Sequence, residues 1–204
     1  MLTHDLLGYV RSALPAPPAR VLEIGAGDGA LAAALREIGY DVLAIDPAGE
    51  QPGVVGLHLH RVDAPAESFD AAVAVLSLHH VEPLADSCRR LAEVLRPGRR
   101  LVVDEFDVQR FDERAARWWL QQREAQSDHE HADPATLVSE LRGHLHSLAR
   151  LREALAPWFA IGEPTPGPYL HRWALRPELR ALEERLIAEG DLPATGARLV
   201  AVRR

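Results

Sequence analysis

Short apolar runs alternate along this chain with stretches in which apolar residues recur at helical spacing. The apolar runs predict seven strands, at residues 21–24, 42–45, 56–60, 71–76, 101–106, near 158–162 and 197–202. Helices are predicted for an amphipathic opening stretch and for residues 30–38, 84–95 and 177–188. Strands that alternate with crossover helices predict an α/β fold with a mostly parallel sheet.

Residues 112–155 interrupt this alternation. They are helical in pattern, rich in Arg, Glu and His, and contain the adjacent Trp118 and Trp119. We interpret the region around 110–155 as a helical cap inserted into a single domain that covers residues 1–204. Residues 162–168 (GEPTPGP) have the composition of a rigid surface loop.

The composition is that of an ordinary globular protein and narrows the range of partners. Hydrophobic residues make up 47% and charged residues 26% of the 204 positions, close to the average for folded domains. The formal charge of −7, from 30 acidic and 23 basic side chains, argues against nucleic acid and anionic lipid as partners. No apolar run approaches the roughly 18 residues that a membrane span needs. The first residues do not resemble a signal peptide, so we expect a cytoplasmic protein.

Two residue types restrict the possible chemistry. The single cysteine, Cys88, excludes a disulfide within the chain and a zinc site built from cysteines. The chain has no lysine, which excludes Schiff-base catalysis and lysine general bases. Histidine is then the natural candidate for a base near neutral pH.

The strongest local motif is VLEIGAGDGA, an apolar strand that runs through Gly25, Gly27 and Gly29 directly into a helix. Glycines permit the positive backbone torsions of a tight turn and let a ligand approach the main chain, while the helix start offers free N–H groups. The same residues satisfy GxGxxA, which dinucleotide-binding folds also use. The turn therefore indicates a nucleotide-containing cofactor without choosing among several.

Acidic residues at three strand ends narrow the choice of cofactor. Asp46 ends the second strand, where a carboxylate accepts hydrogen bonds from the hydroxyls of an adenosine ribose. Glu23 lies inside the strand before the turn, positioned to order the glycine loop, and Asp63 follows the third strand, positioned to accept from an adenine amino group. A nicotinamide cofactor leaves Glu23 and Asp63 unexplained, so the pattern favours S-adenosylmethionine.

The block FDAAVAVLSLHHVEPLADSCRRLAEVLRPGRRLVVDEF adds a strand, a turn, a helix and a Pro-Gly reversal into a fifth strand. With the glycine turn it resembles the class I S-adenosylmethionine-dependent methyltransferases of the small-molecule type, such as those of ubiquinone and menaquinone biosynthesis. The resemblance is clear over residues 21–106. It implies a Rossmann-like, seven-stranded, mostly parallel sheet with an antiparallel last strand, S-adenosyl-L-methionine as cofactor and S-adenosyl-L-homocysteine as product.

The resemblance also assigns cofactor contacts. It puts the glycine turn under the methionine portion, the end of the second strand at the ribose, the residues after the third strand at the adenine, and the end of the fourth strand on the floor of the site. The residues so assigned are Glu23, Gly25, Ala26, Gly27, Asp46, Pro47, Asp63, Ala64, Leu76, Ser77 and Leu78. A purely structural role for the three acidic residues, as caps of strands and turns, is the alternative.

Candidate catalytic residues lie at the carboxyl ends of two strands. A sulfonium already makes its methyl group electrophilic, so the protein must chiefly position the acceptor, and a base can assist by removing its proton. His79 and His80 follow the fourth strand, Asp104 and Glu105 end the fifth on the same edge, and Asp107 follows them. One of these carboxylates is a candidate to bind a cationic substrate or to accept its proton. The alternatives are a packing or cofactor-lining role for the histidines and simple solvation for the carboxylates.

Candidate acceptor-binding residues lie later in the chain. They are Trp118, His129, His131, Tyr169 and Arg172. Histidines two positions apart diverge by about 200° on a helix, which makes a poor chelate, so we expect no metal.

The function that we predict is methyl transfer from S-adenosylmethionine to a small-molecule acceptor. O- or N-methylation is favoured and C-methylation is possible. The alternatives are an NAD(P)-dependent oxidoreductase and a non-catalytic S-adenosylmethionine-binding protein. We expect no nucleic-acid or membrane partner, and a monomer or homodimer.

Overall fold

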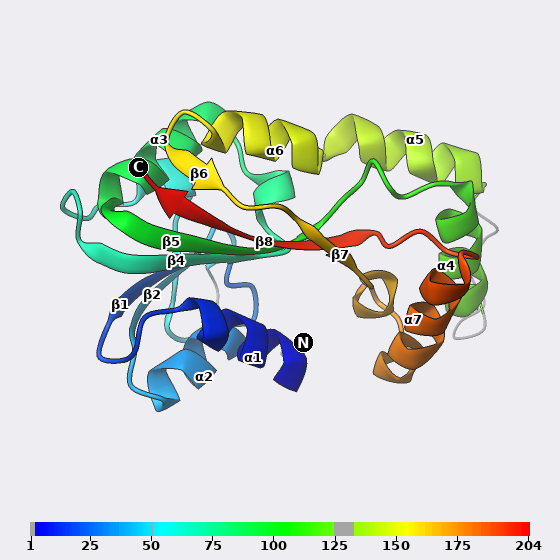
Figure 1. Cartoon of the computed structure of the whole chain (residues 1–204), viewed down its shortest axis with the longest axis horizontal. Helices are drawn as coiled ribbons and strands as arrows, with labels where there is room; N and C mark the ends of the chain where they lie inside the picture. Colours follow the sequence, from blue (N-terminus) through cyan, green and yellow to red (C-terminus); the bar gives the residue numbers. More distant parts are fainter. Residues whose placement is uncertain (1–2, 50, 125–132) are drawn as a thin grey trace.

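A computed structural model describes residues 3–49, 51–124 and 133–204 (Figure 1). The α-helices are α1 (His4–Ala13), α2 (Ala30–Glu37), α3 (Leu84–Val94), α4 (Glu113–Glu124), α5 (Pro134–His144), α6 (Leu148–Leu155) and α7 (Arg180–Glu189). The short 3-10 helices are η1 (Leu59–Arg61), η2 (Leu78–His80), η3 (Leu170–Arg172) and η4 (Pro177–Leu179). The strands are β1 (Arg20–Ile24), β2 (Asp41–Asp46), β3 (Val54–Gly56), β4 (Phe69–Val75), β5 (Leu95–Phe106), β6 (Phe159–Ile161), β7 (Thr165–Gly167) and β8 (Gly196–Arg203).

Within the described residues, the strands form one eight-stranded sheet. Its order is β3-β2-β1-β4-β5-β8-β6, and β7 pairs with β8 beside this path. Strands β1 to β5 pair in parallel, whereas β8 runs antiparallel to β5, β6 and β7. The predicted α/β class, the mostly parallel sheet and the antiparallel last strand are confirmed.

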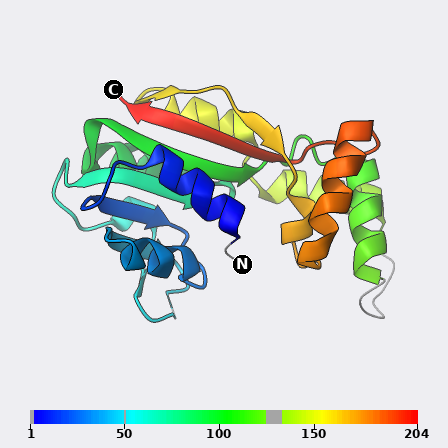
Figure 2. The ribbon, with the colours of Figure 1, turned by 60° about the horizontal axis from the view of Figure 1, so that its bottom comes forward.

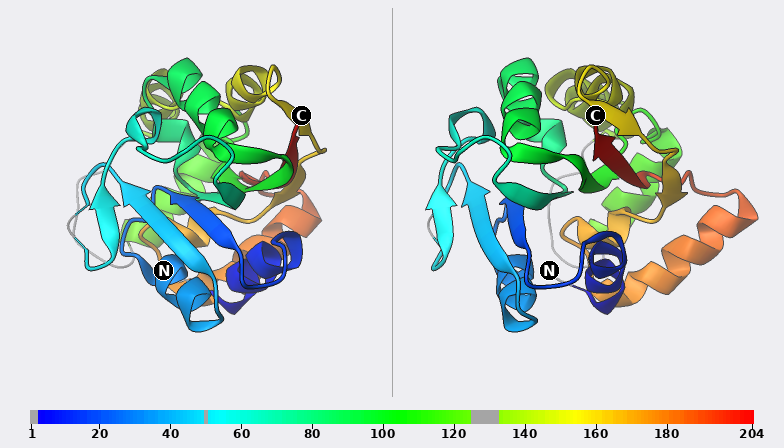
Figure 3. Two further views of the ribbon diagram at one scale, coloured as in Figure 1. Left: turned by 90° about the vertical axis from the view of Figure 1, so that its left-hand side faces the viewer. Right: turned by 60° about the vertical axis from the view of Figure 1, so that its left-hand side comes forward.

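Helices cover both faces of the sheet, as Figures 1 and 3 show. On one face, α1 and α2 bury Val10 and Leu35 against Val21 and neighbouring strand residues. On the other face, α3 and α6 bury Leu91 and Leu151 in a second cluster. The apolar strands are buried on both faces because each is sandwiched between these layers.

Two strand predictions were wrong in detail. The third strand was expected at residues 56–60 but is β3, which ends at Gly56, because the backbone at Leu59–Arg61 turns into η1. The expected surface loop 162–168 contains β7, because the long β8 pairs with β6 along its second half and with β7 along its first.

The expected cap of residues 110–155 is divided between two parts of the molecule. Helices α4 and α5 join α7 and η3 in a third apolar cluster, beyond the carboxyl end of β5, and Figure 2 shows α4 and α7 grouped there. Helix α6 instead packs on the sheet through Leu148, Leu151 and Leu155. We call the group α4, α5, α7 and η3 the helical cluster. In the part of the chain that the structure describes, no helix is long and apolar enough to cross a membrane.

Candidate functional site

A cavity of about 810 Å³ opens at the carboxyl ends of β1, β2 and β4. Open parallel sheets form their ligand crevices at this edge. Its lining comprises Leu6, Glu23, Ile24, Gly25, Ala26, Gly27, Asp28, Ala30, Leu31, Ile45, Asp46, Pro47, Ala48, Leu57, His58, Leu59, Val75, Leu76, Ser77, His80, Val81, Glu82 and Arg172. The predicted glycine turn, Asp46, His80 and Arg172 therefore border one space.

The glycine turn owes its shape to backbone and packing constraints. Gly25 and Gly27 have φ of 69° and 53°, in the left-handed region that favours glycine. A Cβ on Gly25 would lie 2.2 Å from Cβ of Ser77, so a larger residue does not fit. A Cβ on Gly27 would meet nothing within 4 Å, because this part of the turn faces open space. The turn thus offers an uncovered main chain to a ligand.

Asp46 ties the end of β2 to this turn. Its Oδ2 accepts a hydrogen bond from the backbone N–H of Gly27 at 3.0 Å, and its Oδ1 accepts from Ala48 at 2.9 Å. A carboxylate has about four acceptor positions, so lone pairs remain for hydroxyl donors in the cavity. The arrangement matches the predicted role of Asp46 toward a ribose.

Glu23 carries the most unusual electrostatics of the cavity lining. The residue is 3% exposed, and its Oε2 has no hydrogen-bond partner within the described structure. Burial raises the pKa of its carboxyl to about 7, opposed by the charge of Arg36 and reinforced by Asp28. A buried acceptor of this kind is stabilised when a cationic donor binds beside it.

The other predicted cofactor contacts divide into two groups. Ala26, Pro47, Leu76 and Ser77 line the cavity with the residues described above. Leu78 is buried in the core, Asp63 is exposed and Ala64 is buried, and none of these three is part of the lining. In their place Leu57, His58 and Leu59 line the cavity. These three residues directly follow β3. The sequence analysis missed them because it extended the third strand to residue 60, whereas β3 ends at Gly56.

The two adjacent histidines have different surroundings. His79 is buried, and its Nδ1 hydrogen-bonds to Oε2 of Glu105. His80 lines the cavity. Burial lowers the pKa of His80, and the nearby His79 and His146 lower it further against an opposing effect of Glu105. These surroundings favour the neutral form of the His80 imidazole, which can accept a proton.

Glu105, one of the carboxylates that the sequence places at the end of the fifth strand, makes contacts that the sequence did not predict. It is fully buried, and its Oε1 accepts from the backbone N–H groups of Ser77 at 2.8 Å and Leu78 at 2.6 Å. These bonds hold the turn that carries His80. The position of Glu105 in the sequence indicated a residue near the site, but only the structure shows that it binds this turn.

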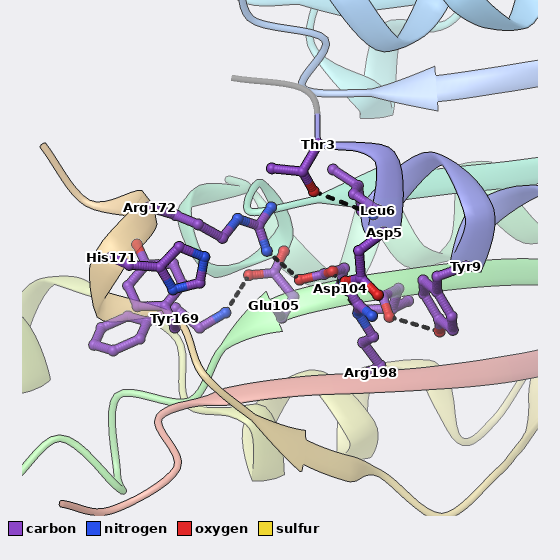
Figure 4. Close-up of polar contacts among 12 residues, drawn as sticks. Thr3, Asp5, Leu6, Tyr9, Asp104, Glu105, Tyr169, His171, Arg172 and Arg198 are labelled. Atoms are coloured by element: carbon purple, nitrogen blue, oxygen red, sulfur yellow. Dashed lines mark hydrogen bonds and ion pairs between the residues drawn. The ribbon is translucent and has the colours of Figure 1, made fainter. Parts of the chain in front are cut away.

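Asp104 is engaged by two arginines and does not line the main cavity (Figure 4). Its Oδ1 accepts from Nη1 of Arg172 at 2.7 Å, and its Oδ2 accepts from Nε of Arg198 at 2.8 Å. Both carboxylate oxygens of Asp104 therefore accept hydrogen bonds from guanidinium groups. The structure thus gives Asp104 a place in an ion-pair network, away from the position predicted for a base.

Among the predicted acceptor contacts that the structure describes, Arg172 lines the cavity and Trp118 and Tyr169 do not. Trp118 and Tyr169 are buried in the helical cluster, and Tyr169 stacks on Phe106 with ring centroids 4.5 Å apart. His129 and His131 lie outside the described residues. Among the described residues, no group of three His, Cys, Asp or Glu side chains is arranged to hold a metal ion.

The glycine turn that opens a helix, the acidic residue at the end of the next strand and the antiparallel last strand agree with the features expected of a class I S-adenosylmethionine-dependent methyltransferase. A family model described as "Methyltransferase domain" matches residues 3–153, and the chain belongs to this family. The match gives no support to the nicotinamide alternative.

Individual relatives agree with this assignment. A ubiquinone biosynthesis O-methyltransferase of Xanthomonas campestris is 40% identical over 117 residues, which are 50% of this chain and 48% of that protein. The chain thus spans about half the length of the curated relatives it matches.

Solved structures share the fold over a greater length. An S-adenosylmethionine-dependent methyltransferase from Mesorhizobium loti has a TM-score of 0.61 at 21% identity, over 99% of this chain and 98% of that one. A 1,6-didemethyltoxoflavin-N1-methyltransferase from Burkholderia thailandensis, crystallised with bound 1,6-didemethyltoxoflavin and S-adenosylhomocysteine, has a TM-score of 0.54 at 21% identity. The matched part is 92% of this chain and 71% of that one.

Proposed function

We propose that this protein transfers a methyl group from S-adenosylmethionine to a small-molecule acceptor. The observation that carries the proposal is one cavity that joins the open main chain at Gly27, the carboxylate of Asp46 and the unpartnered buried oxygen of Glu23. This combination suits a ligand with ribose hydroxyls at one end and a cationic amino-acid portion at the other.

The residues present fit the cofactor. Gly25 and Gly27 would lie along its methionine portion, Asp46 would accept from the ribose, and the buried carboxylate of Glu23 would face its positive charge. When bound, S-adenosylmethionine supplies an electrophilic methyl group, which an acceptor lone pair takes as the carbon–sulfur bond breaks and the electron pair stays on sulfur. Leu57, His58 and Leu59 would take the place predicted for Asp63 and Ala64 beside the adenine.

The proton that an O–H or N–H acceptor loses on methylation needs a destination. Nε2 or Nδ1 of His80 would receive it, because His80 lines the cavity and its lowered pKa favours the neutral ring, which has a free lone pair. His79 would act as a positioning residue, since its ring is buried against Glu105. We keep O-methylation and N-methylation as the leading reactions, and the O-methyltransferase relative supports the first. C-methylation is the third possibility.

The cofactor is tested by calorimetric titration of the purified protein with S-adenosylhomocysteine, with NADH in parallel. We expect micromolar binding of the first and none of the second. Binding of NADH alone would contradict the proposal. Release of S-adenosylhomocysteine during turnover of an acceptor panel then separates an enzyme from a non-catalytic binding protein. The cytoplasmic location, the absence of nucleic-acid partners and the monomeric or dimeric state remain predictions.

A further inference from the structure

Arg172 reaches the cavity from outside the part of the chain that matches the family. It lies in η3, after the end of the matched residues 3–153. It lines both the main cavity and a second cavity of about 180 Å³ that lies against Asp104, Arg198 and Arg180. Among the described residues of the main lining, it is the one arginine.

The guanidinium of Arg172 is held in a fixed orientation. Its side chain is 13% exposed, and Asp104, to which Nη1 donates at 2.7 Å, is its hydrogen-bond acceptor among the described residues. The Asp104 carboxylate is 5% exposed and is shared with Arg198, which binds its other oxygen. Arg198 has a second acidic partner in Asp5, at 2.8 Å, whereas Asp104 is the acidic partner of Arg172 among the described residues. A guanidinium has five N–H donors, so Arg172 retains donors and positive charge for a ligand.

The charged groups that line the main cavity differ in sign. Glu23, Asp28 and Asp46 belong to the glycine turn and to β1 and β2, and Glu82 follows the turn that carries His80, where it pairs with His146 at 3.0 Å. Arg172 is the one guanidinium in the described lining. Carboxylates suit the cationic cofactor, and a guanidinium suits an anionic group with paired oxygens. Arg172 is thus the group of this lining that suits an anionic ligand.

We propose that Arg172 binds a carboxylate of the methyl acceptor, so that the acceptor is an organic acid, and that Asp104 is the positioning residue that directs this guanidinium into the cavity. The proposal rests on the proposed methyl transfer. A carboxylate is the shared chemistry of two candidate ligands, because S-adenosylmethionine also carries one. The acceptor is favoured because Arg172 lies on the helical cluster and beyond the family match, apart from the glycine turn.

The test uses benzoate and benzamide as a matched pair of probes, titrated into the full-length protein saturated with S-adenosylhomocysteine. We expect the unsubstituted protein to bind benzoate at least about tenfold more tightly than benzamide. Arg172→Gln should abolish this preference, and Arg172→Lys should retain part of it. Arg198→Gln is the matched control, because it removes a guanidinium from the same Asp104 carboxylate but does not line the main cavity. It should keep the preference.

The remaining outcomes separate the two proposals. Two outcomes would overturn the role of Arg172 and leave the proposed methyl transfer standing. They are the lack of a benzoate preference in the unsubstituted protein and the persistence of that preference in Arg172→Gln. A tenfold or greater loss of S-adenosylhomocysteine affinity in Arg172→Gln, absent with a decarboxylated analogue, would assign the residue to the cofactor and also overturn the proposal. Failure of the unsubstituted protein to bind S-adenosylhomocysteine would overturn the proposed function, and this inference with it.

Discussion

Two turns of the molecule are built in the same way and serve different parts of the cavity. Each is a short 3-10 helix, η2 or η3, preceded by a residue of nearly equal backbone torsions: φ −133° and ψ −37° at Ser77, φ −138° and ψ −37° at Tyr169. In each, a buried glutamate accepts from successive backbone N–H groups and from Nδ1 of a buried histidine. The next residue, His80 or Arg172, lines the cavity.

The two turns differ in which part of the protein supplies the glutamate. Glu105 of β5 holds η2, and the same turn touches the glycine turn, because Oγ of Ser77 donates to the carbonyl of Ile24 at 2.7 Å. Glu183 of α7 holds η3 within the helical cluster. Burial opposes the ionisation of Glu183, but hydrogen bonds from His171 and three amides lower the pKa of its carboxyl. On our proposals His79 and His171 are positioning residues, and the residues that follow them, His80 and Arg172, contact the ligands.

Removing the two glutamates should produce the largest effects and separate the turns. Glu105→Ala and Glu183→Ala should each lower the free energy of unfolding by about 3–5 kcal/mol, because buried amides and a histidine lose their acceptor. Only Glu105→Ala should also weaken S-adenosylhomocysteine binding. Urea denaturation and calorimetry measure both quantities.

Glu184→Ala is the matched control on α7, because this exposed side chain pairs with Arg180 on the surface of the same helix. It should change the stability by less than about 0.5 kcal/mol. Glu105→Gln, which keeps one acceptor oxygen, serves if the alanine variant does not fold. Equal losses of cofactor affinity in Glu105→Ala and Glu183→Ala would break the distinction between the turns.

Within η2, His80→Gln should lower kcat by about 100-fold or more, because the proton acceptor is lost. Its affinity for S-adenosylhomocysteine should stay within about twofold of the unsubstituted protein, since the turn itself is held by Glu105. His79→Gln should instead chiefly lower stability. Initial rates of S-adenosylhomocysteine release measure kcat, and full activity in His80→Gln would refute its role as base.

Asp46→Ala sharpens the comparison by acting on the cofactor alone. Loss of the ribose acceptor should weaken S-adenosylhomocysteine binding by about 1.5–3 kcal/mol, since the hydrogen bonds are charge-assisted. The benzoate preference assigned to η3 should not change. Calorimetric titration with S-adenosylhomocysteine and with benzoate measures both affinities. An unchanged cofactor affinity would count against the proposed site.

The pH dependence of cofactor binding should show the smallest effect. The pKa of Glu23 is about 7, so the affinity for S-adenosylhomocysteine should fall by up to about tenfold per pH unit below pH 7, as the carboxylate is protonated. Glu23→Gln should flatten this profile. In the absence of ligand, the folding stability changes with pH in the opposite direction to the cofactor affinity. The raised pKa of Glu23 contributes stability below pH 4.5, and this contribution is lost as the pH rises through 7. 5′-Methylthioadenosine, which lacks the amino group, is the control and should show little pH dependence.

Most of the fold could be predicted because apolar periodicity and punctuation by Gly and Pro are local properties. The errors arose where neighbouring elements decided the outcome. Residues 56–60 alternate apolar and polar side chains, yet the chain turns into η1 after β3. Pro166 lies in a loop-like composition, yet β7 pairs with the open edge of β8. Helix α6 followed the predicted helical pattern, but only packing showed that it covers the sheet.

By itself, the sequence determined the α/β class and the part of the cavity that suits the cofactor, because the glycine turn and Asp46 depend on short-range backbone geometry. Only the tertiary structure decided which of two adjacent histidines enters the cavity, and that Arg172 faces the same space as Gly27. The directions of His80 and Arg172 depend on these two turns. Glu105 joins η2 to β5, which is distant in the chain, and Glu183 joins η3 to α7 in the helical cluster. A side chain's direction in such a turn is set by its long-range partners, which no local pattern encodes.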